Sequence, residues 1–359
     1  MTTRADKLGH RADTVATALR SEIVGGKVRT GTLLPSVRAL ARRYSLDAKT
    51  LWRALKGLES ERLVVAEPGR GFRVLPGAND PLAGCPVALV LGDASDPGQL
   101  ESGSNALLSV LHAAAGARGL SAVGFRAEPG KTGQLLDQLR SIRAFGAVTD
   151  CLDAQVVDAL RGAGFPVVMF DMSMEARGVD AVMQDGYRGG LLAARYFLGR
   201  GKQRIAWLGD DGRTPHRLDR FAGVAAGFFE AGREMDASFR VEANRANGVE
   251  KARELLSRGD RPDAVIALWS YLALAAKRAA DELGLAVERD FEMVGWSVAE
   301  NYAAHYRPAF GAGPVPPCVT WSARTMAQTV LARLLERREH PGLEPVTVRI
   351  PAELNFDRG

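Results

Sequence analysis

From residue 87 onward, short apolar segments that favour strands alternate with longer segments that favour helices. Repeated strand–helix units require a largely parallel sheet covered by helices on both faces. About 270 residues of this pattern exceed what one such layer needs, so we predict two similar lobes. The cleft between them should lie at the carboxyl ends of the strands, where open α/β sheets bind ligands. The predicted strands are 87–91, 122–125, 147–148, 166–170, 205–208, 264–268 and 293–295, and the predicted helices are 105–118, 134–143, 154–163, 187–199, 221–231, 249–258 and 272–283.

The first 75 residues follow a different pattern, in which apolar residues recur at helical spacing over 14–24 and 37–44. A third helix is predicted to run to residue 60, with Asp47 as its N-cap. Its leucines share one face, and the opposite face forms a basic stripe with one aromatic residue. The second and third helices are short and are joined by a tight turn. They have the dimensions to place the third helix in the DNA major groove. The stripe consists of Lys49, Trp52, Arg53 and Lys56.

Two β-prone runs follow the third helix, at 64–67 and 72–74. They flank Pro68-Gly69-Arg70-Gly71, a turn sequence, and therefore predict a hairpin. Arg70, between two glycines at the hairpin tip, can approach DNA closely. The N-terminal segment is thus predicted to be an α+β winged helix-turn-helix, with 76–85 as linker and 86–355 as the α/β domain.

Positive charge is concentrated in this N-terminal segment. Residues 1–77 contain 15 Lys+Arg and 7 Asp+Glu, a balance of +8, whereas the remainder of the chain has a balance of −3. A small basic unit joined to a nearly neutral large one indicates that the small unit meets a polyanion. From the charge alone, two alternatives stay open: the basic residues form a solvated face, or the small unit binds an anionic membrane surface.

Composition narrows the class of protein further. With 46% hydrophobic and 25% charged residues, the chain has enough apolar material for full-sized cores. No apolar run approaches the roughly 20 residues of a membrane span, and residues 1–10 do not resemble a signal peptide, so we expect a cytoplasmic protein. Cys85, Cys151 and Cys318 lack metal-ligand spacing and are interpreted as buried free thiols. Neither a metal nor a cofactor is expected.

The N-terminal segment resembles the GntR-family winged helix-turn-helix over residues 11–75. That resemblance implies DNA contacts by Arg38, Thr50, Arg70 and Gly71. The chain departs from the family pattern with Ala48 and Trp52, where arginines are common. The matching residues are Ala18-Leu19-Arg20, Ile23, Gly26, Leu34-Pro35-Ser36, Arg38, Leu40-Ala41, Thr50-Leu51, Ala54-Leu55, Leu58-Glu59, Leu63 and Gly69-Arg70-Gly71.

These departures shift the expected base contacts to neighbouring residues. Lys49 and Arg53 are candidates for guanine or phosphate contacts. Trp52 is a candidate for contact with a thymine methyl group or a phosphate, and the alternative is that it packs under the wing. For the basic residues the alternative is a solvated helix face.

The larger domain contains a series of short motifs in a fixed order. They are Asp185-Gly186, Gly189-Gly190, Ala193-Ala194, Leu198-Gly199, Arg204 to Gly209, Arg220 to Gly223, Arg261 to Val265, Val294-Gly295-Trp296 and Val319-Thr320. Through these motifs the domain resembles the LacI/GalR effector domain, which is similar to periplasmic sugar-binding proteins. A GntR-type head on such a domain is the arrangement of the AraR-like arabinose repressors.

The resemblance implies effector contacts by Asp171 and by Arg220 at the start of its helix, since both groups form directional charge-assisted bonds to hydroxyls. For both, an interlobe salt bridge or a helix cap is the alternative. Asp93 ends the first strand and is placed near the cleft by topology alone.

The chain also departs from the LacI/GalR pattern, because Trp269-Ser270 replaces an Asn-Asp pair and Ser297 replaces an aspartate. Trp269 and Trp296 are candidates for stacking on a sugar or another flat ligand, with hinge or core packing as the alternative. Together with Ser297 they complete the set of predicted effector-binding residues.

We therefore predict a homodimeric transcription regulator that binds double-stranded operator DNA. Repression of a carbohydrate-utilisation operon is the predicted output, with operator affinity modulated by a sugar-like effector. A ligand-independent regulator or an activator stays open as an alternative. An enzyme or a non-DNA-binding sugar-binding protein is a further one, although no GxxxxGK[ST], GxSxG, HExxH or GxGxxG motif is present where a reaction would need it.

Overall fold

The computed structural model describes residues 4–75, 85–92, 104–210 and 215–356. The chain divides by packing into two compact units, the first formed by residues 1–88, 115–123 and 137–145 and the second by the remainder. In the described part of the chain, one two-stranded sheet and two six-stranded sheets are present. The predicted combination of an α+β head with a two-lobed α/β domain is confirmed, while the exact domain boundaries stay predictions.

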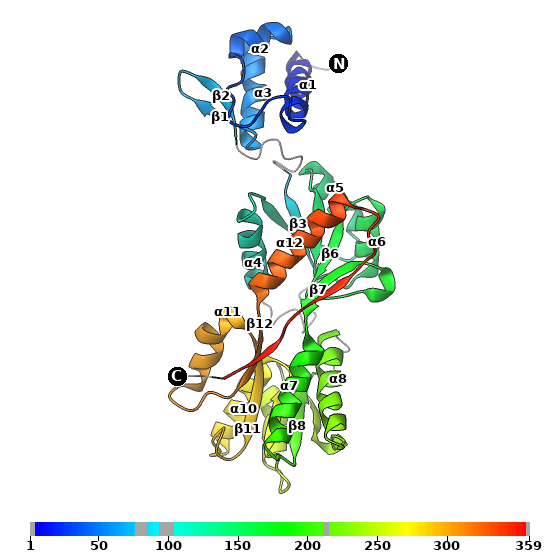
Figure 1. Ribbon diagram of the computed structural model, residues 1–359, viewed down its shortest axis with the longest axis vertical. Coiled ribbons are helices and arrows are strands. Elements are labelled where there is room, and N and C mark those ends of the chain that lie inside the picture. The colour runs from blue at the N-terminus through cyan, green and yellow to red at the C-terminus, as the bar shows by residue number, and fades with distance from the viewer. Residues whose placement is uncertain (1–3, 76–84, 93–103, 211–214, 357–359) are drawn as a thin grey trace. The chain divides into compact units, whose positions relative to one another are not determined.

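The N-terminal segment contains three helices and one hairpin (Figure 1): α1 (Arg4–Val24), α2 (Val37–Arg43), α3 (Ala48–Ser60), β1 (Val64–Glu67) and β2 (Gly71–Val74). The prediction of α1 was wrong at its start, because apolar spacing marks only the turns that pack against the core. All three helices and both strands contribute to one core, whose buried members include Leu19, Ile23, Leu40, Leu51, Leu55, Leu58, Leu63, Val64, Phe72 and Val74.

Local side-chain bonds fix where these elements start and turn. Ser36 caps α2 by accepting a hydrogen bond from the Ala39 N–H at 3.2 Å. The strands pair antiparallel, with Val64 opposite Val74 and Glu67 opposite Gly71. At the hairpin tip, Gly69 and Gly71 have φ angles of 73° and 112°, a left-handed conformation that favours glycine.

The first lobe is built on the sheet β13-β7-β6-β5-β3-β4. Pairing of β5, β6, β7 and β13 is parallel, as expected for strand–helix units. The strands are β3 (Val87–Leu91), β4 (Ala122–Arg126), β5 (Gly146–Thr149), β6 (Val167–Phe170), β7 (Asp180–Gln184) and β13 (Thr347–Ile350), and the helices are α4 (Ser104–Gly116), α5 (Thr132–Ser141), α6 (Ala154–Gly162) and α12 (Ala323–Glu339).

The second lobe is built on the sheet β14-β12-β11-β10-β8-β9. Its strands pair in parallel, except that β14 runs antiparallel to β12. Helices α7 and α8 pack side by side. The strands are β8 (Ile205–Gly209), β9 (Arg240–Glu242), β10 (Ala264–Ala267), β11 (Glu292–Val298), β12 (Cys318–Trp321) and β14 (Glu353–Asn355), and the main helices are α7 (Gly186–Gly199), α8 (Pro215–Glu230), α9 (Gly248–Leu256) and α10 (Ser270–Glu282).

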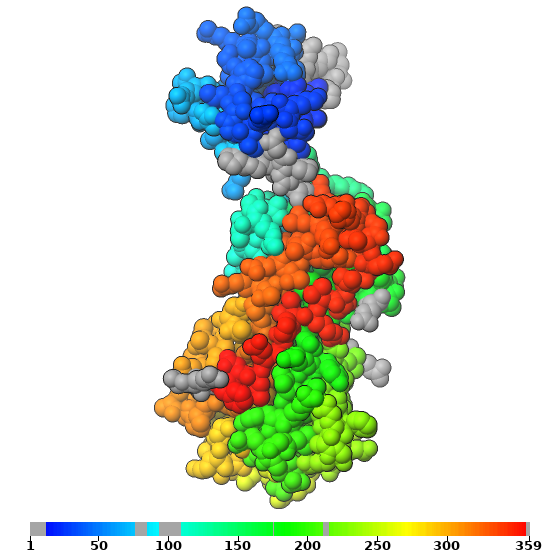
Figure 2. All heavy atoms as spheres, in the orientation of Figure 1, coloured from blue at the N-terminus to red at the C-terminus, as the bar shows by residue number. Residues whose placement is uncertain are grey.

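The chain passes between the two lobes where β7 leads into α7, where β12 leads into α12, and where β13 leads into β14 (Figure 1). Figure 2 shows the C-terminal segment (red) on the surface of both lobes. Strands β7, β9, β12, β13 and β14 and helix α12 were not predicted. These three connections between the lobes lie at one edge of both sheets. The cleft lies beside them, between the carboxyl ends of the strands.

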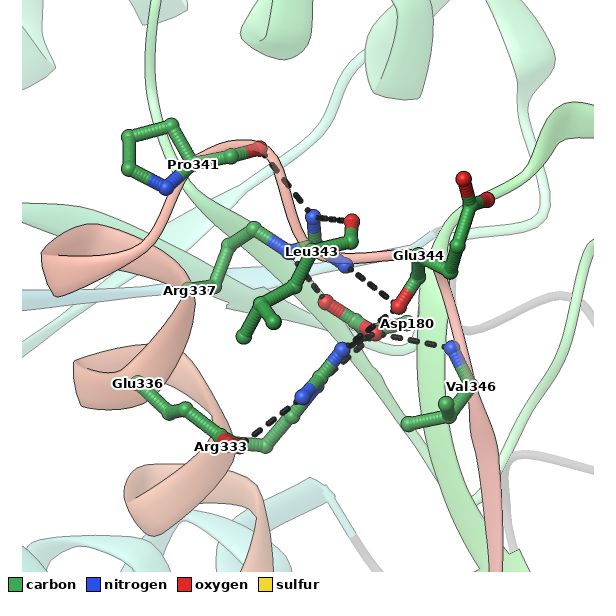
Figure 3. Close-up of polar contacts among 8 residues, drawn as sticks. All are labelled: Asp180, Arg333, Glu336, Arg337, Pro341, Leu343, Glu344 and Val346. Atoms are coloured by element: carbon green, nitrogen blue, oxygen red, sulfur yellow. Dashed lines mark hydrogen bonds and ion pairs between the residues drawn. The ribbon is translucent and has the colours of Figure 1, made fainter.

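Asp180 connects β7, α12 and the segment that enters β13 in the first lobe (Figure 3). Its buried carboxylate accepts hydrogen bonds from Arg333 Nε at 2.9 Å, Arg337 Nε at 2.7 Å and the Val346 N–H at 3.0 Å. Burial by itself raises the pKa of Asp180, but the bonds from Arg337, Val346 and Arg333 outweigh it, so the pKa lies below its ordinary value. The carboxylate thereby joins β7, α12 and the segment that enters β13.

All three cysteines lie in the described part of the chain. Cys151 and Cys318 are buried free thiols as predicted, whereas Cys85 is only half-buried. Within the residues that the structure describes, no helix is both long and apolar enough to span a bilayer.

Candidate DNA-contacting surface and interlobe cavity

Helix α3 presents a continuous exposed face. Lys49, Trp52 and Arg53 are exposed, with half of the Trp52 surface open to solvent. Lys56 lies over the Trp52 ring, 5.1 Å from its centre, and pairs with Glu59. Leucines on the opposite face are buried in the head core, so the basic stripe is free to contact a partner. Trp52 is therefore not buried in the head core, and its contact with DNA stays a prediction.

Thr50 lies on the other side of α3 from this stripe and is buried. Its N–H donates to Asp47 Oδ1 at 2.8 Å and its hydroxyl donates to Asp47 Oδ2 at 2.7 Å. These bonds from Thr50 lower the pKa of Asp47 and complete the helix cap. The Thr50 hydroxyl is therefore bonded to Asp47 in this structure, and the DNA contact that the family resemblance implies for Thr50 stays a prediction.

Arg38 on α2 and Arg70 at the hairpin tip are both exposed. The Arg70 side chain is 71% exposed, and its Nη1 lies 3.9 Å from Glu67 Oε2. Glu67 is held mainly by Arg73, whose Nε donates to it at 2.5 Å. Arg70, next to Gly71, is thus left extended into solvent, as the predicted wing contact requires.

A cavity of about 300 Å³ lies between the two lobes, and all of its lining residues belong to the second unit. Five of the six predicted effector residues meet there, and Asp93 lies outside the described residues. Their contact with a ligand stays a prediction. The lining consists of Asp171, Gln184, Arg220, Trp269, Ser270, Leu274, Trp296, Ser297, Val298, Asn301, His305, Tyr306 and Trp321.

Asp171 follows β6 in the first lobe and has a φ of 53°, in the left-handed region that aspartate tolerates better than most residues. Its backbone N–H donates to the Val182 carbonyl at 2.7 Å, which holds the turn. The side chain is buried and accepts hydrogen bonds from the Gln184 side chain at 3.1 Å. His216 Nε2 lies 3.6 Å from Asp171 Oδ2. Asp171 is therefore held firmly at the cavity wall.

Arg220 enters the cavity from α8 in the second lobe. The prediction that it starts its helix was wrong, because α8 begins at Pro215, a residue suited to a first helical turn. The guanidinium donates to the Leu268 carbonyl and, at 2.6 Å, to Gln184 Oε1. Only 1% of Arg220 is exposed.

Glycines in α7 and α8 allow the two helices to pack closely, and this packing positions Arg220 at the cavity. A Cβ on Gly190 would collide with the Arg220 carbonyl, and one on Gly223 would collide with the Tyr187 carbonyl, so the close approach of α7 and α8 at these positions requires glycine. On Gly189 a Cβ would collide with the Trp296 ring. The Gly189-Gly190 and Gly223 positions of the sequence motif thus have a packing cause.

Trp269 and Trp296 flank Arg220, with its guanidinium carbon 4.3 Å and 3.9 Å from the respective ring centres. Trp269 Nε1 donates to Asp210 at 2.7 Å, and Trp296 Nε1 donates to Gln184 at 2.9 Å. Both indoles are buried. Each one stacks on the arginine, a cation–π arrangement that gains strength when shielded from water.

Ser297 follows Trp296 on β11 and is half-buried at the cavity rim. Its hydroxyl donates to the Val298 carbonyl at 3.2 Å. Replacement of a carboxylate by this hydroxyl removes a charge from the second lobe's side of the cavity.

The two domains also match known families. Residues 11–74 match the bacterial regulatory proteins of the gntR family, and residues 194–356 match the periplasmic binding protein-like domain. The chain joins a GntR-type helix-turn-helix domain to a periplasmic-binding-protein-like domain. The exposed stripe of α3 lies in the GntR-type domain, and Arg220, Trp269 and Trp296 lie in the matched part of the periplasmic-binding-protein-like domain.

Individual proteins are similar to parts of this chain. The HTH-type transcriptional repressor PurR of Yersinia enterocolitica is 29% identical over 199 residues, which cover 53% of this chain and 54% of PurR. The chain thus spans about half the length of the curated relatives it matches. A regulatory protein of the LacI family from Chloroflexus aggregans has a TM-score of 0.64 at 22% identity, over 75% of this chain and 96% of that one. The transcriptional regulator CelR in complex with cellobiose has a TM-score of 0.63 at 20% identity, over 90% of this chain and 99% of that one. These two likenesses establish the fold.

Several residues of the periplasmic-binding-protein-like domain were missed by sequence reasoning. Gln184 ends β7 and Asp210 directly follows β8. The rule that ligands meet the carboxyl ends of strands points to Asp210 from the predicted strand 205–208, and it would have selected Gln184 had β7 been predicted. Asp150, which follows β5, accepts a bond from the Gly92 N–H at 2.7 Å, and burial raises its pKa. No local signal marks the cavity residues that follow β11, which are Asn301, His305 and Tyr306.

Proposed function

We propose that the chain is a sequence-specific DNA-binding transcription regulator whose operator affinity is changed by a small molecule in the interlobe cavity. The observation that carries the DNA-binding half is the exposed Lys49–Trp52–Arg53 face of α3, anchored from behind by buried leucines. Arg38 and Arg70 extend the positive surface to α2 and the hairpin tip. Such a surface supplies both the phosphate attraction and the base-edge contacts that operator binding needs.

Repression is the proposed output. It is supported by the PurR relatives, which are named as repressors. A regulator of this kind acts in the cytoplasm, and two copies placing two heads on a palindromic operator is the arrangement we propose. No catalytic step is assigned to the chain.

A carbohydrate is the proposed class of effector. It is supported by the likeness to CelR, which was solved with cellobiose. In the cavity, Ser270, Asn301 and His305 offer polar groups beside aromatic walls, a combination suited to sugar hydroxyls and sugar faces. An effector shifts operator affinity only as far as it binds two shapes of the protein with different affinity.

Selection from a random duplex library with the full chain tests this function. Enrichment of one palindromic motif, and its loss in a Lys49→Ala/Arg53→Ala double variant, is the expected result. A matched Lys277→Ala/Arg278→Ala double variant on α10 should select the same motif as the parent. If the parent enriches no motif, the regulator function is wrong.

A further inference from the structure

Gln184 makes bonds across the interlobe cleft. It ends β7 in the first lobe, yet its Oε1 accepts from Arg220 Nη2 at 2.6 Å and from Trp296 Nε1 at 2.9 Å, both in the second lobe. Gln184 is buried, with 2% of its surface exposed. One side-chain oxygen thus receives two donors from the opposite lobe.

The orientation of the Gln184 amide follows from its neighbours. Its Nε2 donates to both oxygens of Asp171 at 3.1 Å. An ionised carboxylate only accepts, whereas guanidinium and indole N–H groups only donate, so the reversed amide would lose every one of these bonds. Gln184 therefore connects a buried anion of the first lobe to a buried cation of the second.

The partners of Gln184 in the second lobe are themselves held in place. Arg220 lies between the rings of Trp269 and Trp296, and Trp269 is bonded to Asp210 at 2.7 Å. All three stacked side chains have 1–2% of their surface exposed. The charged and aromatic groups that a ligand would use to join the lobes are already engaged with one another.

We propose that Gln184, Arg220, Trp269 and Trp296 form a latch that holds the two lobes closed without a ligand. Entry of an effector then opens the latch, because it must compete with Gln184 for Arg220. This is the reverse of closure around a ligand. The link from latch to operator affinity rests on the proposed function, whereas the closed state of the lobes does not.

The distance between spin labels on the two lobes tests the latch in the full chain, measured by double electron–electron resonance in buffer with no ligand and no DNA. Labels are placed through Gln155→Cys on α6 and Ser257→Cys after α9, both exposed, with Cys85→Ser to prevent labelling there. Cys151 and Cys318 are buried and stay unlabelled. The parent should show one narrow distance.

Gln184→Leu keeps the size of the side chain but removes the acceptor and the donor, so the label distance should become longer and broader. Gln203→Leu is the matched control, since that exposed amide donates only to the Gly201 carbonyl, and it should leave the distance unchanged. Trp296→Phe removes one donor while keeping a ring, and should lengthen the distance in part. If circular dichroism shows that Gln184→Leu does not fold, the label distance in Trp296→Phe tests the latch instead.

The latch is refuted by a folded Gln184→Leu variant with the distance of the parent, or by a parent whose distance is already broad. With Gln184→Leu unfolded, an unchanged distance in Trp296→Phe refutes it equally. Because no DNA is present, either result leaves the proposed function standing. Failure of operator selection likewise leaves the result on the latch intact.

Discussion

The guanidinium of Arg220 lies over the ring of Trp296, with 3.9 Å between its central carbon and the ring centre. The two residues come from different elements, α8 and β11, and Gln184 from the other lobe bonds to both. Their meeting depends on how closely α7 and α8 pack, since α8 carries Arg220 and α7 makes room for Trp296 at Gly189. Correct helix packing is thus a precondition for the cavity.

Gly223→Ala tests this dependence. The added methyl group would collide with the Tyr187 carbonyl and push α8 away from α7, so we expect a loss of about 1–3 kcal/mol in the free energy of unfolding. Urea denaturation followed by circular dichroism measures it. Gly133→Ala in α5 is the control, because nothing lies within 4 Å of the added group. It should be neutral or stabilising by about 0.5–1 kcal/mol, and an equal loss in both variants would contradict the packing argument.

Asp180→Asn should lower the free energy of unfolding by about 3 kcal/mol at pH 7, because two largely buried arginines lose their shared anion. The folded-state pKa of Asp180 is depressed, so its contribution is fully present above the ordinary aspartate pKa of about 4. Below that pH the contribution is lost as pH falls through the folded pKa. The gap between parent and variant should therefore stay constant from neutral pH down to about 5 and narrow below about 4.

Urea denaturation at a series of pH values measures this gap. Asp137→Asn, on an exposed carboxylate paired with Arg140, is the control and should show no comparable loss. A gap for Asp180→Asn that is as wide at pH 3 as at pH 7 would show that its charge is not what joins β7 to α12.

How far the sequence predicts this structure depends on where the signals lie. The head was predicted well because its signals are local: Asp47 caps the helix it precedes, and Gly69 and Gly71 flank the turn they form. Strand β7 was missed because it begins with Asp180 and ends with Gln184, polar residues whose partners come from distant parts of the chain. Short-range patterns cannot show such partners.

The same limit applies to the candidate site. Resemblance to known families selected Asp171 and Arg220, and both line the cavity. That Arg220 would lie between Trp269 and Trp296 was not predicted, because stacking is set by tertiary packing. The bond between the Thr50 hydroxyl and Asp47 was likewise not predicted, whereas the DNA contact that the resemblance implies for Thr50 stays a prediction.

Arg38→Ala should weaken operator binding by about 1–3 kcal/mol, because Arg38 is an exposed cation on α2, the helix that packs against α3. Fluorescence anisotropy with the selected duplex measures the loss. Arg278→Ala, on an exposed arginine of α10 in the second lobe, is the control. Equal affinity of the Arg38→Ala variant and the parent would remove α2 from the proposed interface.

In the proposed function, the cationic face of α3 and the hairpin tip bind duplex DNA through phosphate as well as base contacts. Its most direct test is the affinity of the full chain for the selected duplex, measured by anisotropy as salt rises from about 50 to 200 mM. We expect a steep linear fall of log affinity with log salt, and a shallower slope for Lys49→Ala/Arg53→Ala. An affinity that does not change with salt would contradict the proposed DNA contacts.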